Sequence, residues 1–274
     1  QYSSENKKLI IDVCDPAGIN ALNNNYEYDI INAQKFMEIA RSIKSQDEII
    51  CMKASVKTAE KGILLMHENL KVGMTEEELW SILHKTNIEN GGEWFETRLL
   101  NSGPKTNPWF QECSNRIIQE GELVAFDTDM VGPYGYCADI SRTFVEGKKL
   151  SNYQNKIHSL AYENVKYNEQ LIKPGVSFRE FAEKAWQLPD NCFDNHYPCQ
   201  IHGVGMSDEW PYIGYPDEDY SNGDYSGTFQ ENMVVCVESY IGEVGANEGA
   251  KLEDQYLVTE KGLELLSSIP LDLV

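Results

Sequence analysis

Apolar residues recur at helical spacing in several segments of the chain, and each segment begins at a capping signal. Ser45 stands three residues before Glu48, and an apolar-periodic segment then runs to about residue 68. A hydroxyl and a carboxyl group at this spacing satisfy free backbone N–H groups at the start of a helix. Three further segments begin in a similar way, at Thr75, Ser151 and Ser177. We therefore predict a helix after each of the four caps.

Short apolar runs separated by glycine and proline occupy the rest of the chain. Residues 94–145 have this pattern, and the part from about residue 200 returns to it, which predicts short strands. Residues 9–13 form another β-like run. For the Asn-rich residues 20–25 that follow it we predict a loop, and from residue 34 onward helices are expected to dominate.

Two segments about a hundred residues apart resemble each other. Leu-Lys-Val-Gly-Met-Thr at 70–75 and Ile-Lys-Pro-Gly-Val-Ser at 172–177 each follow one predicted helix and precede another. This spacing is too long for a solenoid repeat. The match predicts two similar halves, with a site formed between them.

The charge balance excludes some classes of partner. Lys and Arg total 23 against 44 Asp and Glu, which gives a formal charge of −21. A field of this sign repels phosphate backbones and anionic lipid, so we expect no nucleic-acid partner and no membrane partner. The odd number of cysteines, 7, without a CxxC pair, favours isolated thiols in a reducing compartment. We therefore expect a cytoplasmic protein.

Three aspartates adjoin apolar, strand-like segments in the middle of the chain. Asp127 and Asp129 directly follow the apolar residues 123–126. On a strand these two carboxylates would lie on the same face, because side chains alternate with period two. Asp139 begins a second strand after a Gly-rich turn, so a hairpin would bring it beside them. Like charges crowded in this way repel unless cations lie between them, which predicts a cation site.

The final third of the chain supplies three further candidates. His202 precedes Gly-Val-Gly, which permits a close approach of the backbone. Glu238 ends an apolar strand, and Glu253 lies in another apolar segment where an unpartnered carboxylate would be costly to bury. One histidine among several carboxylates makes an oxygen-rich site that suits Mn, Fe, Co or Zn. The candidate metal ligands are therefore Asp127, Asp129, Asp139, His202, Glu238 and Glu253.

These residues lie in motifs that resemble a known superfamily. Gly-Tyr-x-x-Asp-Ile-x-Arg-Thr occupies 135–143, and Glu-Asp-x-x-Leu-Val-Thr-Glu-x-Gly occupies 253–262. With the order Asp, Asp, His, Glu, Glu, the chain from about 35 to 270 resembles the methionine aminopeptidase and proline peptidase superfamily. The resemblance implies an α+β pita-bread fold, in which two α/β halves surround a central cleft with two divalent metal ions. It also implies a homodimer, a catalytic domain at 34–274, and that residues 1–33 are the tail of an N-terminal domain.

The chain departs from the peptidases where they keep two substrate-side histidines. Asp208 and Glu209 stand in place of the His of His-Gly-x-Gly-x-x-x-His-Glu, and Trp109 follows Asn-Pro where the other His is usual. These departures, with Phe-Asp-x-Asp and Gly-Pro-x-Thr-Asn-Pro-Trp-Phe-Gln, resemble the metal-dependent dimethylsulfoniopropionate lyases. That resemblance implies cleavage of a small sulfonium acid to dimethyl sulfide and acrylate.

The lyase reaction assigns expected roles to residues near the altered positions. Asp208 is the candidate general base, six residues after His202. A sulfonium is favoured by aromatic faces, at roughly 0.5 to 2 kcal/mol for each good contact. The candidate substrate-binding aromatics are Trp109, Tyr197 and Trp210, although ordinary core packing explains each one singly.

Two other functions are compatible with the same motifs. The first is a Xaa-Pro aminopeptidase or dipeptidase, which would use a bound hydroxide as nucleophile, and the missing histidines count against it. The second is a non-catalytic pita-bread module that binds a partner. Such a module is expected to lose metal ligands, and none of the expected ligands is lost here.

Overall fold

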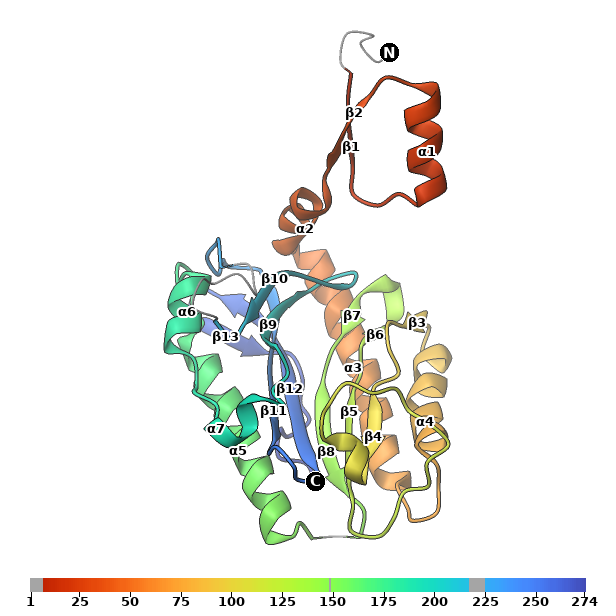
Figure 1. Cartoon of the computed structure of the whole chain (residues 1–274), viewed down its shortest axis with the longest axis vertical. Coiled ribbons are helices and arrows are strands. Elements are labelled where there is room, and N and C mark those ends of the chain that lie inside the picture. Colours follow the sequence, from red (N-terminus) through yellow and green to blue (C-terminus); the bar gives the residue numbers. More distant parts are fainter. Residues whose placement is uncertain (1–6, 148, 217–224) are drawn as a thin grey trace.

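The computed structural model describes residues 7–147, 149–216 and 225–274. Its main body has helices on the outside and strands between them (Figure 1). The described helices are α1 (Pro16–Asn25), α2 (Gln34–Ser42), α3 (Gln46–Asn69), α4 (Glu76–Glu89), α5 (Asn152–Asn168), α6 (Phe178–Lys184) and α7 (Asp190–Phe193). Short 3-10 turns lie at Gly103–Thr106, Pro133–Gly135 and Glu169–Leu171. No helix in these ranges is both long and apolar enough to span a membrane.

The strands form one large sheet and several smaller ones. The large sheet has the order β10-β9-β11-β12-β13, with β9 (Cys199–Val204), β10 (Asp208–Gly214), β11 (Val234–Gly242), β12 (Gly249–Thr259) and β13 (Gly262–Leu265). A second sheet has the order β4-β5-β8, with β4 (Leu100–Ser102), β5 (Leu123–Asp127) and β8 (Ser141–Val145). A third is β3 (Trp94–Phe95), β6 (Met130–Val131) and β7 (Cys137–Ala138), and β1 (Lys8–Ile11) pairs in parallel with β2 (Asp29–Asn32).

All four helix starts predicted from the capping signals are confirmed. The side chains of Ser45, Thr75 and Ser151 each accept a hydrogen bond from the backbone N–H three residues later. The side chain at that later position in turn accepts a hydrogen bond from the backbone N–H of the cap residue. Ser177 accepts from the N–H of Glu180. Local chemistry thus determines where the main helices begin.

The two halves repeat the same local structure, as the internal match predicted. Gly73 and Gly175 both have φ of +90°, a left-handed conformation that glycine adopts without a steric cost. Gly73 N donates to Ile118 O at 3.0 Å, and Gly175 N donates to Phe229 O at 2.8 Å. Each half also has its own apolar core, α3 and α4 against β5 in one half and α5 and α6 against β11 in the other.

Two predictions about secondary structure are wrong. The Asn-rich residues 20–25 are helical rather than a loop, because Asp15 caps α1 by accepting from Gly18 N at 2.6 Å and Pro16 starts the helix. The strands of the final third are not all short: β11 has 9 residues and β12 has 11. They are long because nearly every position in both is buried between the sheets and α5.

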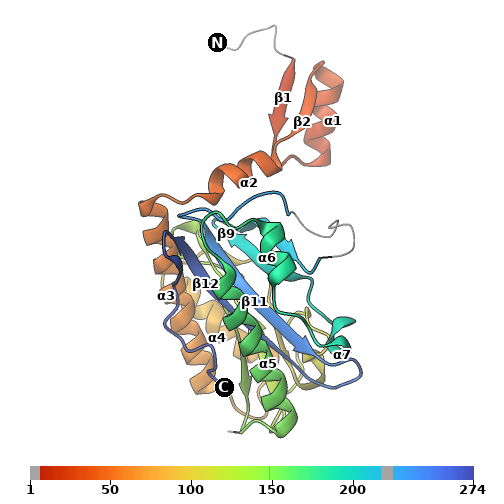
Figure 2. The same cartoon turned by 90° about the vertical axis from the view of Figure 1, so that its left-hand side faces the viewer.

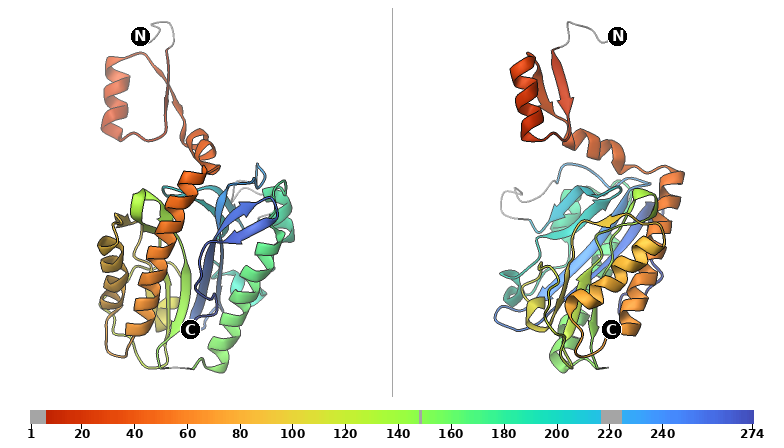
Figure 3. Two further views of the ribbon diagram at one scale, coloured as in Figure 1. Left: turned by 180° about the vertical axis from the view of Figure 1, so that it is seen from behind. Right: turned by 90° about the vertical axis from the view of Figure 1, so that its right-hand side faces the viewer.

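The N-terminal residues lie outside the main body. Strands β1 and β2 with α1 form a small lobe, and α2 connects it to α3 (Figures 2 and 3). Helix α2 also packs against β10 of the large sheet. The predicted boundary between residues 33 and 34 stays a prediction.

A buried ion pair between two of the sequence motifs joins the halves. Arg142 Nη2 on β8 donates to Asp254 Oδ1 on β12 at 2.7 Å, and the two side chains are 0% and 1% exposed. Replacing Arg142 with Met leaves a buried carboxylate without its cation, so we expect the free energy of unfolding to fall by about 3 to 5 kcal/mol. Urea unfolding of metal-free protein measures this loss. The exposed pair Arg98–Glu112, at 3.0 Å, is the control, and Arg98→Met is expected to cost about 1 kcal/mol or less. Equal losses in the two variants would contradict the prediction.

Candidate active site

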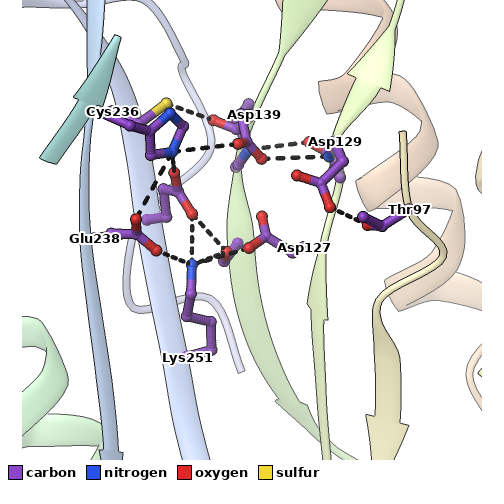
Figure 4. Close-up of polar contacts among 12 residues, drawn as sticks. Thr97, Asp127, Asp129, Asp139, Cys236, Glu238 and Lys251 are labelled. Atoms are coloured by element: carbon purple, nitrogen blue, oxygen red, sulfur yellow. Dashed lines mark hydrogen bonds and ion pairs between the residues drawn. The ribbon is translucent and has the colours of Figure 1, made fainter. Parts of the chain in front are cut away.

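The six predicted metal ligands come together between the two halves. Asp127 ends β5, His202 lies on β9, and Glu238 and Glu253 are directly opposed on β11 and β12. Asp139 lies between β7 and β8. Figure 4 shows Asp127, Asp129, Asp139 and Glu238 converging from both halves of the molecule.

His202 lies at the centre of the cluster. Its Nε2 is 3.0 Å from Glu253 Oε1, 3.5 Å from Asp139 Oδ2 and 3.7 Å from Glu238 Oε1. On the other side, Asp129 N donates to Asp139 Oδ1 at 3.3 Å. Asp139 therefore lies between the histidine side and the aspartate side of the cluster.

The local geometry differs from the prediction at three of these residues. Asp129 does not continue the strand of Asp127. Its φ is +36°, and it lies in the turn between the end of β5 and the start of β6. Asp139 precedes β8 instead of beginning a strand, and Glu238 lies in the middle of β11 rather than at its end. The simple alternation assumed for Asp127 and Asp129 is therefore wrong. Both side chains nevertheless line the same cavity.

Burial of so many carboxylates shifts their pKa values. Burial, with the charge of Asp127, raises the pKa of Asp129 and of Asp139 well above the usual range. Burial raises the pKa of Glu238 to about 7, although the Lys251 ammonium opposes the shift. Burial lowers the pKa of His202, but Asp208 and Glu253 outweigh it and hold that pKa well above its ordinary value. The cluster thus lacks enough positive charge for its carboxylates, which divalent cations would supply.

The donor atoms suit metal ions. Ligand atoms of Asp139, His202, Cys236 and Glu253 lie within 4.8 Å of one another, and so do those of Asp127, Asp129 and Asp139. Two buried oxygens of the cluster, Asp127 Oδ1 and Glu238 Oε1, have no hydrogen-bond partner. Burial raises the pKa of the Cys236 thiol well above its ordinary value, so the oxygens and His202 are the better donors.

The sequence analysis missed Lys251, a buried cation in the same cluster. Its ammonium is 2.9 Å from Asp127 Oδ2, 2.8 Å from Glu238 Oε2 and 2.5 Å from Glu253 Oε2, and its side chain is fully buried. These three carboxylates form a further group with ligand atoms close together, and the single ammonium balances part of their negative charge. A signal was present: Lys251 stands between Ala250 and Leu252, two residues before Glu253, so the two share one face of the strand.

Asp208, the predicted base, lies at the edge of the cluster. Its Oδ1 is 3.7 Å from His202 Nδ1 and has no hydrogen-bond partner, and the side chain is 31% exposed. Burial, with the charges of Glu253 and Asp127, raises the pKa of Asp208. The carboxylate of Glu96, which sequence reasoning also missed, accepts a hydrogen bond from the backbone of Asp208 and lines the same cavity.

Glu209 fixes the strand that bears Asp208. Glu209 Oε1 is 2.8 Å from Lys44 Nζ, and both side chains are at most 2% exposed. Arg41 Nη2 is 3.2 Å from Glu209 Oε2. The adjoining hairpin is tight, because a Cβ atom on Gly203 would lie 2.2 Å from the carbonyl oxygen of Trp210. Both Asp208 and Glu209 line the cavity, but Glu209 is held in ion pairs with Lys44 and Arg41.

The cavity beside the cluster has a volume of about 590 Å³. Tyr197 and Trp210, two of the predicted substrate-binding aromatics, line it. Trp109 is not among its lining residues in the described chain; it is 6% exposed, stacks on Tyr240 and lines a neighbouring cavity of about 440 Å³. The structure instead places Phe110 and Tyr212 in the wall of the larger cavity.

The model of metallopeptidase family M24 matches residues 50–260, which is most of the chain. The chain belongs to this family. Its fold is also that of solved structures: the prolidase from Pyrococcus furiosus superimposes with a TM-score of 0.83 at 24% identity, over 96% of this chain and 77% of that one. The X-Pro aminopeptidase from Thermotoga maritima gives 0.78 at 22% identity, over 97% and 75%. The predicted pita-bread fold is therefore confirmed.

Relatives with higher sequence identity are named for a different activity. The dimethylsulfoniopropionate lyase DddP of Roseovarius nubinhibens is 40% identical over 99% of this chain and 62% of its own length. The DddP of Roseobacter denitrificans is 39% identical over 97% of this chain and 60% of its own. The chain thus spans about three fifths of the length of these relatives. Within the M24 family, the resemblance to lyases seen in the motifs extends over nearly all of this chain.

Proposed function

We propose that this chain carries the catalytic site of a metal-dependent lyase that cleaves dimethylsulfoniopropionate to dimethyl sulfide and acrylate. The observation that carries the proposal is Asp208, which lines the cavity beside the carboxylate cluster and has one buried oxygen without a hydrogen-bond partner. Among the described residues that line this cavity, His202 is the sole histidine. A site of this kind has a base but lacks the second histidine expected for handling a peptide bond. The similarity to the two DddP lyases supports the same reaction.

Two divalent ions would be held by the cluster. One would be held by His202, Asp139, Glu238 and Glu253, and the other by Asp127, Asp129 and Asp139. The donor set suits Fe, Mn, Co or Zn. When bound, such ions bind a substrate carboxylate and stabilise the negative charge that develops beside it.

Asp208 would perform the proton transfer. Its carboxylate removes a proton from the carbon next to the substrate carboxylate, and the electron pair of that C–H bond forms the carbon–carbon double bond. The carbon–sulfur bond breaks at the same time, its electron pair leaves on sulfur, and neutral dimethyl sulfide departs from acrylate. The proton then passes from Asp208 to solvent. The elimination needs no water nucleophile and no protonated amine leaving group.

The aromatic and acidic wall of the cavity would bind the sulfonium group. Tyr197 and Trp210 provide rings, and Glu38 provides negative charge. A cation is therefore favoured over a neutral group of the same shape.

We also propose the arrangement of the whole protein. Residues 1–33 would be the tail of an N-terminal domain, residues 34–274 the catalytic domain, and the assembly a homodimer in the cytoplasm. The separate lobe of β1, α1 and β2 supports the domain division.

Headspace detection of dimethyl sulfide tests the proposal. Metal-loaded protein is mixed with dimethylsulfoniopropionate, and a parallel sample contains a Xaa-Pro dipeptide that is scored for free amino acid. We expect dimethyl sulfide without peptide cleavage, and at least about a hundredfold less of it after chelation and dialysis. Peptide cleavage alone would return the chain to peptidase chemistry. If metal binds and neither product forms, dimethylsulfoniopropionate is not the substrate of this chain.

A further inference from the structure

Phe110 has a strained backbone and an exposed ring at the same time. Its φ is +80°, in the left-handed region that a bulky residue rarely adopts. The side chain is 56% exposed, although it is large and apolar. Such strain persists only where surrounding structure enforces it, and it is concentrated at functional sites.

The residues on both sides of Phe110 hold it in this conformation. Trp109 is buried and stacks on Tyr240 with 6.3 Å between ring centroids. After Phe110, Glu112 forms a β-bridge with Leu99, and Cys113 N donates to Arg98 O at 2.9 Å. The loop is therefore anchored at each end, and the strained residue between the anchors is directed into the wall of the main cavity.

Phe110 extends an aromatic wall that begins at Tyr197. The two rings stack with 5.7 Å between centroids and an interplanar angle of 25°. Tyr197 already has a cation near its ring, because Lys251 Nζ lies 5.5 Å from the ring centroid. More than half of Phe110 remains exposed beside that stack, so its ring is available to a ligand.

The other aromatics of the cavity offer less free surface. Trp210 is 8% exposed and packs edge-on against Phe178, and Tyr212 is 39% exposed. The cavity wall also contains several carboxylates, among them Glu38, Asp127 and Asp208, which favour a positively charged ligand. An exposed ring in an acidic cavity has the chemistry that recognises quaternary ammonium and sulfonium groups.

We propose that Phe110 is a specificity-determining residue that presents its ring to the methylated cationic group of the substrate. This role deepens the proposed lyase function and rests on it. The anchored loop keeps the ring in place before the ligand arrives, so no ordering of the loop opposes binding. The class of ligand is a small acid with a sulfonium or a quaternary ammonium group.

A matched pair of ligands isolates the contribution of the charge. 3-(Trimethylammonio)propionate and 4,4-dimethylpentanoate have the same shape, but only the first carries a cation. Their dissociation constants are measured by calorimetry on metal-loaded wild-type protein and on Phe110→Leu. We expect the preference of the wild type for the cation to fall about 2- to 30-fold in Phe110→Leu, as the loss of one cation–π contact predicts.

Two control variants distinguish the effect of losing the aromatic ring from the effects of a changed side-chain size and of general destabilisation. Phe110→Tyr keeps a ring and is expected to keep the preference. Phe193→Leu removes a ring that is 50% exposed and stacks on His196 away from the main cavity, and it should leave the preference unchanged. If the wild type prefers the cation and Phe110→Leu keeps the same preference, the proposed role of Phe110 is wrong, but the proposed function is not affected. A wild type without any preference overturns the sulfonium-binding part of the proposed function as well.

Discussion

An Asp208→Asn variant is expected to release dimethyl sulfide about 10²- to 10⁴-fold more slowly than the wild type while keeping its metal. The amide has the same size as the carboxylate but cannot accept the substrate proton. Asp208 lies 3.7 Å from His202 and is not among the carboxylates whose oxygens group closely in the cluster, so metal binding should not depend on it. The turnover number comes from headspace gas chromatography, and metal content comes from plasma mass spectrometry.

Asp194→Asn is the matched control for this variant. Asp194 lines the neighbouring cavity and not the main one, so its amide variant should keep a turnover number within about twofold of the wild type. If Asp208→Asn loses metal along with activity, Asp208 is a ligand and its role as the base is wrong. Full activity in that variant would assign the proton transfer to another group.

Features that depend on local chemistry were predicted well from the sequence. The capping residues Ser45 and Thr75 determine helix starts through bonds to positions three residues away, so no distant contact is needed. The likeness of residues 70–75 and 172–177 also held, because each glycine makes the same left-handed turn. Where a cap was overlooked, at Asp15, the prediction of a loop was wrong.

The candidate ligands could be identified from sequence motifs, but their positions relative to one another could be determined only from the folded structure. Period-two alternation could not show that the strand ends before Asp129, since alternation assumes extended backbone and Asp129 has a left-handed φ. Neither could it show that Glu238 and Glu253 are direct partners across two strands, because strand register depends on long-range pairing. That these residues hold metal stays a prediction.

The sequence could not distinguish a buried aromatic from an exposed one. Trp109 and Phe110 are neighbours, and the one predicted to contact substrate is packed behind Tyr240. The backbone at Phe110 turns the other ring into the cavity wall. Lys251 was missed for a related reason: one lysine in an apolar strand indicates a buried partner, yet the three carboxylates around it come from β5, β11 and β12.

Replacing Lys251 with Met is expected to destabilise the metal-free protein by about 3 to 5 kcal/mol and to make its stability strongly dependent on metal. The ammonium is fully buried among Asp127, Glu238 and Glu253, so the variant leaves three carboxylates without a counter-charge. Cation binding to the cluster should then tighten, and bound metal stabilises the folded state by mass action. Thermal unfolding with a chelator and with Mn²⁺ measures the difference.

Two lysine variants show whether this effect belongs to the buried charge. Lys251→Arg retains the cation and is expected to widen the metal-dependent difference in unfolding temperature much less than Lys251→Met. Lys53→Met breaks a pair with Glu264 whose side chains are 44% and 49% exposed, and it should leave that difference unchanged. If Lys251→Met loses the same stability with metal as without it, the lysine acts by filling space. A selective loss in the metal-free protein means that Lys251 neutralises part of the cluster, so that fewer metal ions are needed to balance its carboxylates.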